Sequence, residues 1–176
     1  MSGLPTVVTP ATVPSAEAAG RRRREPLATV DATTQKVQRI LVAEFSDVRL
    51  RKDGFLLPGG STAAFIEIQA WTPDKDGNPR TLVYIWAPLG RDVKPSEDLY
   101  HWAAVDGQQF RLGTVTVLDE KEKGTCFIQF DHTIMGDYLD PAELVTAVGA
   151  VLFTADDLDE TVHDRFGGKR YTDPSE

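Results

Sequence analysis

The sequence predicts an α+β fold: a five-stranded antiparallel sheet with helices on one face, in the order α-β-β-β-α-β-β-α. Two observations predict it. Apolar residues recur at helical spacing near both ends of the domain. Between these ends, apolar residues mostly alternate with polar ones, at a period of two residues. The expected strands also follow one another through short polar turns, and the expected helices are kept apart from them, which is typical of a sheet-and-helix layer.

The first helix is expected over about 32–45, because Val37, Leu41 and Phe45 recur every four residues with Ile40 beside them. Before it, residues 1–30 are rich in Thr, Pro, Ala and Val and contain no aromatic residue. Such a segment cannot offset the entropy lost on ordering, so we expect a disordered tail.

Three strands follow in this interpretation. The first begins at Val48 and continues past a turn at Asp53-Gly54, the second covers about 62–71, and the third covers about 81–87 and stops at Pro88. The polar loop 73–79 joins the last two as a hairpin. Its alternating Asp and Asn residues loosely resemble a calcium loop, but the Gly position and the missing Glu favour a plain turn.

The second half begins with a short helix over about 97–106, for which Ser96 is the expected N-cap. Two strands, about 112–119 and 125–132, then flank the charged turn 120–124. The last helix, about 141–166, has a full start signal: Asp140 as the cap and Pro141 at the first helical position. Gly167-Gly168 supplies its stop.

The 176 residues suit one domain over 31–168 with tails at 1–30 and 169–176. Cys126 is the single cysteine and alternates with core residues, so we expect a buried thiol and no intrachain disulfide. A reducing, cytoplasmic compartment fits this usage, and a secreted protein without disulfides is the alternative. No segment reaches the roughly 18 apolar residues of a membrane span.

The formal charge of −8 is unevenly distributed. Residues 1–30 hold four arginines against Glu17 and Glu25, a net charge of +2, so the remaining chain carries −10. An acidic body repels phosphate backbones, which argues against nucleic-acid binding by the folded domain. The run Arg21–Arg24 is typical of a solvated segment; the alternative is a regulatory adaptor tethered through this run to an acidic partner or anionic lipid.

Signals for catalysis are sparse. The three histidines do not fall at a metal-ligand spacing, and Gly59-Gly60-Ser61 lacks the ending of a phosphate-binding loop. We therefore expect no catalytic residues, no metal and no cofactor. One alternative stays open: a small hydrolase or metal-dependent enzyme centred on His132 and Asp137. The structural interpretation is that His132 ends a strand and hydrogen-bonds the Gly136-Asp137 turn. The acidic run 156–160 is expected on a solvated helix face.

Strand alternation divides the expected sheet into two different faces. One face is aliphatic and suits packing under helices. The other mixes aromatic and polar residues, as an interface does. The residues expected to bind a partner on this second face are Phe65, Trp71, Leu82, Tyr84, Trp86 and Phe127. Two interpretations are open: an interface for another polypeptide, or a face covered by the tail or a loop.

Several segments carry a family resemblance, which covers about residues 35–168. They are Val83–Leu89, Asp131–Thr133, Met135–Pro141 with Glu143-Leu144, Ala155–Asp159 and Arg165–Gly168. Together they resemble actinobacterial YbjN-like proteins, which are grouped with the type III secretion chaperone-like superfamily of peptide-binding domains. The resemblance implies the same order of elements, no cofactor and no catalytic residues. It also implies a polypeptide client or partner protein, and homodimerisation of the kind frequent in secretion chaperones.

Overall fold

The computed structural model describes residues 29–174 of the chain. The expected disorder of residues 1–30 therefore falls almost wholly outside the described residues. The elements are α1 (Val30–Glu44), β1 (Arg49–Arg51), β2 (Gly54–Gly59), β3 (Thr62–Trp71), β4 (Arg80–Val93), α2 (Glu97–Val105), the short 3-10 helix η2 (Asp106–Gln108), β5 (Thr114–Glu120), β6 (Thr125–Met135) and α3 (Pro141–Phe166).

The strands form one antiparallel sheet in the order β1-β2-β3-β4-β6-β5. This confirms the α+β class and corrects the strand count from five to six. The difference arises at the turn before Gly54. The segment expected as one strand folds back there, so that Arg51 pairs with Gly54 and Leu50 pairs with Phe55 in a separate hairpin.

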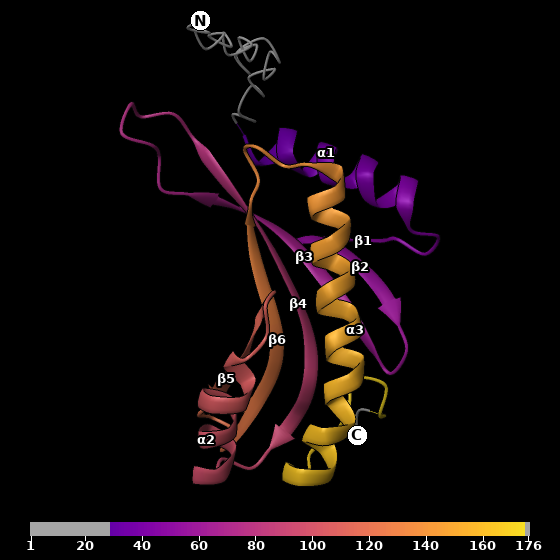
Figure 1. Cartoon of the computed structure of the whole chain (residues 1–176), viewed down its shortest axis with the longest axis vertical. Helices are drawn as coiled ribbons and strands as arrows, with labels where there is room; N and C mark the ends of the chain where they lie inside the picture. The colour runs from indigo at the N-terminus through magenta and orange to yellow at the C-terminus, as the bar shows by residue number, and fades with distance from the viewer. Residues whose placement is uncertain (1–28, 175–176) are drawn as a thin grey trace, which may run out of the picture.

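All three helices cover the same face of the sheet. Figure 1 shows α3 lying lengthwise along the strands, with α1 crossing near one end and α2 close to β5. One core cluster joins the three helices to the sheet; it includes Leu41 of α1, Leu99 of α2, Val148 of α3, Ile85 of β4 and Ile128 of β6, all fully buried. Each such side chain contributes about 1.5–3 kcal/mol by its removal from water.

The helix starts follow local side-chain chemistry. Ser96 accepts a hydrogen bond from the Leu99 amide at 3.1 Å, and Asp140 accepts one from the Ala142 amide at 2.9 Å, so both expected caps are confirmed. Helix α1 begins at residue 30 rather than 32, because the hydroxyl of Thr29 caps it by accepting from the Ala32 amide.

Strand β4 does not stop at Pro88, as the sequence suggested. It continues to Val93, and the register with β6 shifts between Pro88 and Gly90 and again between Gly90 and Val93. An irregular ladder of this kind tolerates a residue that has no N–H to donate, which is why proline is found at bulges. The expected boundary was therefore wrong by a few residues, and the extra length of β4 bears on the candidate site.

Two members of the acidic run on α3 are structural rather than solvated. Asp156 accepts hydrogen bonds from the Ser61 amide at 2.6 Å and the Ser61 hydroxyl at 2.9 Å, and Asp159, only 2% exposed, contacts the same hydroxyl. Gly60 allows this close approach, because its φ is +58° and a Cβ there would lie 1.9 Å from an Asp156 oxygen. The expectation of a wholly solvated acidic face is thus wrong.

Candidate functional site

The sheet has a second face that no helix of residues 29–174 covers, and we call it the open face. It follows from strand alternation: Tyr84 and Trp86 project away from the side on which Val83 and Ile85 enter the core. The strand register places Phe65 opposite Trp86 and Trp86 opposite Asp131. The side chains at the centre of the open face are Leu56, Phe65, Glu67, Leu82, Tyr84, Trp86, Phe127, Gln129 and Asp131.

Three aromatic rings from three strands form the middle of the open face. The rings of Phe65 and Trp86 stack with their centroids 4.1 Å apart, and Phe127 meets Trp86 edge-on at 6.0 Å. Phe65 is only 5% exposed, because the Arg51 guanidinium lies 4.6 Å from its centroid and Tyr171 contacts it edge-on at 5.8 Å. Phe65 therefore forms the base of the aromatic cluster, while Trp86 and Phe127 remain half-buried.

Polar groups run between the rings. The Trp86 indole N–H donates to a Glu67 carboxylate oxygen at 3.0 Å, and the Gln129 amide donates to the Tyr84 hydroxyl and to Asp131. Burial and the neighbouring Asp131 carboxylate raise the pKa of Tyr84 to about 12, so its phenol stays protonated at physiological pH. Among residues 29–174, neither Glu67 nor Asp131 takes part in an ion pair, whereas the Arg51 guanidinium lies over the Phe65 ring and Arg91 lines the pocket beside the rings.

A pocket of about 260 Å³ lies beside the aromatic cluster. Its lining residues are Phe65, Trp86, Pro88, Arg91, Phe127 and Tyr171. Apolar walls with a guanidinium at one side suit an aromatic or aliphatic side chain next to a main-chain carbonyl. The sequence did not indicate Arg91 and Tyr171, since Arg91 follows the expected end of its strand and Tyr171 belongs to the expected C-terminal tail.

The structure brings together only part of the six residues expected to bind a partner. Phe65, Trp86 and Phe127 are in ring contact, and the half-buried Tyr84 and Leu82 continue the same face along β4. Trp71 shares this face but lies at the far end of β3, about 20 Å along the strand from Phe65. It is 51% exposed and is separate from the aromatic cluster.

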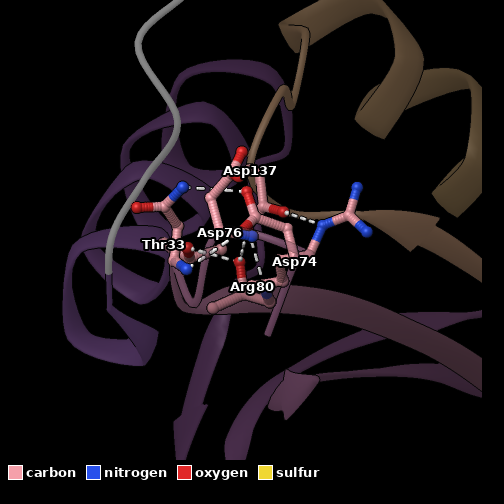
Figure 2. A network of polar contacts seen from close by, with 7 residues as sticks. Thr33, Asp74, Asp76, Arg80 and Asp137 are labelled. Atoms are coloured by element: carbon pink, nitrogen blue, oxygen red, sulfur yellow. Dashed lines mark hydrogen bonds and ion pairs between the residues drawn. The ribbon is translucent and has the colours of Figure 1, made fainter. Parts of the chain in front are cut away.

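The catalytic alternative centred on His132 and Asp137 finds no support in the geometry. The Asp137 carboxylate is 2% exposed and accepts from the Thr81 amide at 2.8 Å and the Thr81 hydroxyl at 3.2 Å, with the Arg80 Nε 3.5 Å away (Figure 2). His132 lies within β6 on the helix-covered side, next to Glu143 in a different pocket. It does not end a strand or hydrogen-bond the turn, so that expectation was wrong.

Asp137 instead ties three distant segments together. The hydroxyl of Thr81 also shares a hydrogen bond of 2.9 Å with Thr33 of α1, and the Gly136 amide donates to the Thr81 carbonyl at 2.8 Å. The network in Figure 2 thus joins α1, the start of β4 and the turn after β6. Charge-assisted hydrogen bonds of this kind contribute about 1.5–3 kcal/mol each to stability.

The remaining candidates have structural explanations. Asp74 accepts hydrogen bonds from the Asp76 and Asn78 amides, both at 2.9 Å, which closes the β3–β4 turn as expected of a plain hairpin. Among the described residues, no group of three or more His, Cys, Asp or Glu side chains is arranged to hold a metal ion. Cys126 is fully buried, as predicted, and burial raises the pKa of its thiol, which disfavours the reactive thiolate.

The comparisons with known proteins give the family. A family model described as "T3SS (YopN, CesT) and YbjN peptide-binding chaperone 1" matches residues 31–174. The match spans most of the chain, so the chain belongs to this family, and the resemblance indicated by the sequence motifs is confirmed. The comparison with curated proteins found no match. None of the helices within residues 29–174 is long and apolar enough to cross a membrane.

Proposed function

We propose that this member of the peptide-binding chaperone family is a non-enzymatic chaperone-like or adaptor module that holds a segment of a partner polypeptide on its open face. The observation that carries the proposal is the aromatic cluster of Phe65, Trp86 and Phe127 on the open face, which the helices of residues 29–174 leave uncovered. Trp86 and Phe127 are half-buried rings beside a pocket, and aromatic anchors of this kind account for much of the binding energy of interfaces. The family description supports a polypeptide as the ligand.

The charges of the open face define the chemistry of the segment that it suits. Glu67 lies opposite Tyr84 and Asp131 lies opposite Trp86 on the neighbouring strands, and neither carboxylate forms an ion pair within residues 29–174. A segment that combines an aromatic side chain with Lys or Arg would fill the pocket and compensate these carboxylates. We therefore propose basic, aromatic-bearing segments as the preferred ligands. Cys126, the single cysteine, cannot form an intrachain disulfide, and we include a cytoplasmic location in the same proposal.

The test is a selection from a displayed library of random short peptides on the immobilised full-length chain. We expect selected peptides to be enriched in aromatic residues and in Lys or Arg. Trp86→Ala should then weaken the affinity for a selected peptide by roughly 30-fold, the effect of removing one interface hot spot. Phe153→Ala is the matched control, because Phe153 is an aromatic residue that is 71% exposed on α3, on the helix-covered side.

Thermal melting of each variant must show a folded domain. Peptides without aromatic enrichment, or an affinity that Trp86→Ala leaves unchanged, would contradict the proposal. Sedimentation of the same variants tests self-association. A homodimer that dissociates on Trp86→Ala, together with no peptide selected, would mean that the open face pairs two copies of this chain rather than holding a client.

A further inference from the structure

Part of the open face is already occupied by the chain itself. We call residues 167–174 the C-terminal strap. It leaves the end of α3 through two glycines in the left-handed region, with φ values of +73° for Gly167 and +85° for Gly168. The strap then passes from the helix layer to the sheet, where Lys169 pairs with Arg91 of β4.

The main chain of the strap pairs with β4 through one isolated bridge. The ladder between β3 and β4 ends at the pair Phe65–Trp86, whereas β4 continues to Val93. Beyond that point, the Arg91 amide donates to the Lys169 carbonyl at 2.9 Å, and the Lys169 amide donates to the Arg91 carbonyl at 2.8 Å. A single antiparallel bridge therefore extends the pairing of β4 beyond the end of its ladder with β3, in the manner in which many peptides add to sheet edges.

The side chains of the strap complete this contact. Tyr171 places its ring edge against the face of Phe65 and forms one wall of the 260 Å³ pocket. The Arg91 guanidinium donates to the Arg170 carbonyl at 3.2 Å and to the Asp173 carbonyl. These are main-chain acceptors, which any peptide in the same position would offer. The Tyr171 ring is the part of the strap that contacts the aromatic cluster, whereas the Arg170 guanidinium lies 3.8 Å from the Glu160 carboxylate of α3.

The strap is nevertheless a lightly held segment. Tyr171 remains 39% exposed, and the strap contributes no residue to the buried core clusters. Segments with few buried apolar contacts open at a small fraction of the cost of global unfolding. We therefore expect the strap to separate from β4 at a lower cost than unfolding of the domain.

We propose that the C-terminal strap is a built-in occupant of the peptide site, which a basic, aromatic-bearing segment of a partner displaces by adding to β4 and placing its ring beside Phe65. This inference rests on the proposed function and adds a regulatory step to it. A ligand that needs the open strap binds with an apparent affinity reduced by the fraction of open molecules. Intramolecular attachment keeps that fraction low, because the effective concentration of the strap is high.

The experiment measures binding of a fluorescent peptide with the sequence of residues 167–176 to the full-length chain. Two variants open the strap by independent means. Tyr171→Ala removes the ring, and Gly168→Ala places a Cβ 2.6 Å from the Arg91 carbonyl oxygen at a φ that alanine rarely adopts. We expect each variant to bind the peptide about tenfold more tightly than the wild type, as follows if the strap is closed in most molecules.

Matched controls separate the contribution of the Tyr171 ring from the effect of opening the strap. Thr172→Ala changes an exposed strap residue and should leave the affinity at the wild-type value. A peptide with Ala in place of Tyr should bind the opened variants at least about tenfold more weakly, since the aromatic anchor is lost. Hydrogen exchange of the Lys169 amide, which is bonded to Arg91 in the closed strap, reports opening directly and should accelerate in Gly168→Ala.

Faster exchange at Lys169 without any gain in peptide affinity would overturn the inference, because the strap would then be open and not competing. So would equal affinity of the Tyr and Ala peptides. The proposed function fails by a different result: peptides selected from the random library would not depend on Trp86. If those peptides do depend on Trp86 but are indifferent to strap opening, the proposed function stands and only the occupancy by the strap is wrong.

Discussion

The helix-covered face and the open face are built from the same strands, yet they hold different kinds of side chain. On β6, Ile128 and Phe130 enter the core at 0% exposure, whereas Phe127 and Asp131 lie half-buried on the other side. The first face is apolar and continuous under three helices. The second alternates rings with carboxylates and amides, and among the described residues Arg51 of β1 and Tyr171 of the C-terminal strap cover its Phe65 ring.

The difference separates what stabilises the domain from what is available for binding. Aliphatic residues buried under helices contribute through their removal from water, and they leave no group free for a ligand. The open face keeps its polar atoms satisfied by short side-chain contacts such as that of Trp86 with Glu67. Variants that differ only in the face they change should therefore lose either stability or binding.

The largest expected effect comes from two phenylalanines on one strand. Phe130→Ala should lower the free energy of unfolding by about 3–5 kcal/mol, because Phe130 is fully buried and its ring packs against Phe110 at 5.0 Å. Phe127→Ala should lower the free energy of unfolding by only about 1 kcal/mol, the contribution of one aromatic contact at a half-buried site. Urea denaturation of both variants measures the two values.

The proposed difference between the two faces would be contradicted if Phe127→Ala were as destabilising as Phe130→Ala. That result would mean that the open face is a second core. A small effect together with weaker peptide binding would sharpen the assignment of Phe127 to the binding surface.

The next largest difference in stability is expected between variants of two carboxylates, one on each side of the comparison. Asp137→Ala should cost about 1.5–3 kcal/mol, since it leaves the buried amide of Thr81 without its charged acceptor. Asp131→Ala, on the open face, should change stability by about 0.5 kcal/mol or less. Peptide affinity should respond in the opposite sense, falling for Asp131→Ala and staying constant for Asp137→Ala. Equal stability losses in chemical denaturation would show that Asp131 is also a structural carboxylate.

A smaller effect is expected at the contact between α3 and the β2–β3 turn. Ser61→Ala removes the hydroxyl that Asp156 and Asp159 share, and it should cost about 1 kcal/mol. The shift in thermal melting measures it, with Thr172→Ala as an exposed hydroxyl control. No loss of stability would indicate that the two carboxylates find other donors once the serine is gone.

Local signals accounted for much of the fold. The stripe from Leu144 to Val162 predicted α3 with its bounds, because one buried side must repeat at helical spacing over the whole helix. The caps at Ser96 and Asp140 were also readable, since a capping side chain bonds an amide only two or three residues away. Alternation likewise predicted which strand residues belong to the aromatic face.

Features that depend on distant partners could not be predicted. The role of Asp137 requires Thr81 to lie beside it, and nothing near Asp137 in the sequence indicates that. The passage of β4 through Pro88 requires the irregular ladder with β6, which becomes evident only when the strands are paired. Tyr171 reaches the open face only through the pairing of Arg91 with Lys169. An aromatic residue in a short polar tail was the one available signal.

The smallest expected effect concerns the half-buried polar layer of the open face, through the titration of Tyr84. The phenol has a pKa of about 12 in the folded chain against an ordinary value of 10.0, because burial and Asp131 disfavour the phenolate. Between these values the unfolded chain loses this proton while the folded chain keeps it, so stability must fall as pH rises through the window. Tyr84→Phe removes this contribution, and its melting temperature should fall less steeply than that of the wild type between pH 10 and pH 12.

The other titrating groups are the same in the wild type and in Tyr84→Phe, and Tyr138→Phe controls for the loss of one phenol elsewhere. Parallel curves for the wild type and Tyr84→Phe would mean that Tyr84 is fully hydrated, and that the open face lacks the half-buried polar layer that distinguishes it from both the core and an ordinary surface.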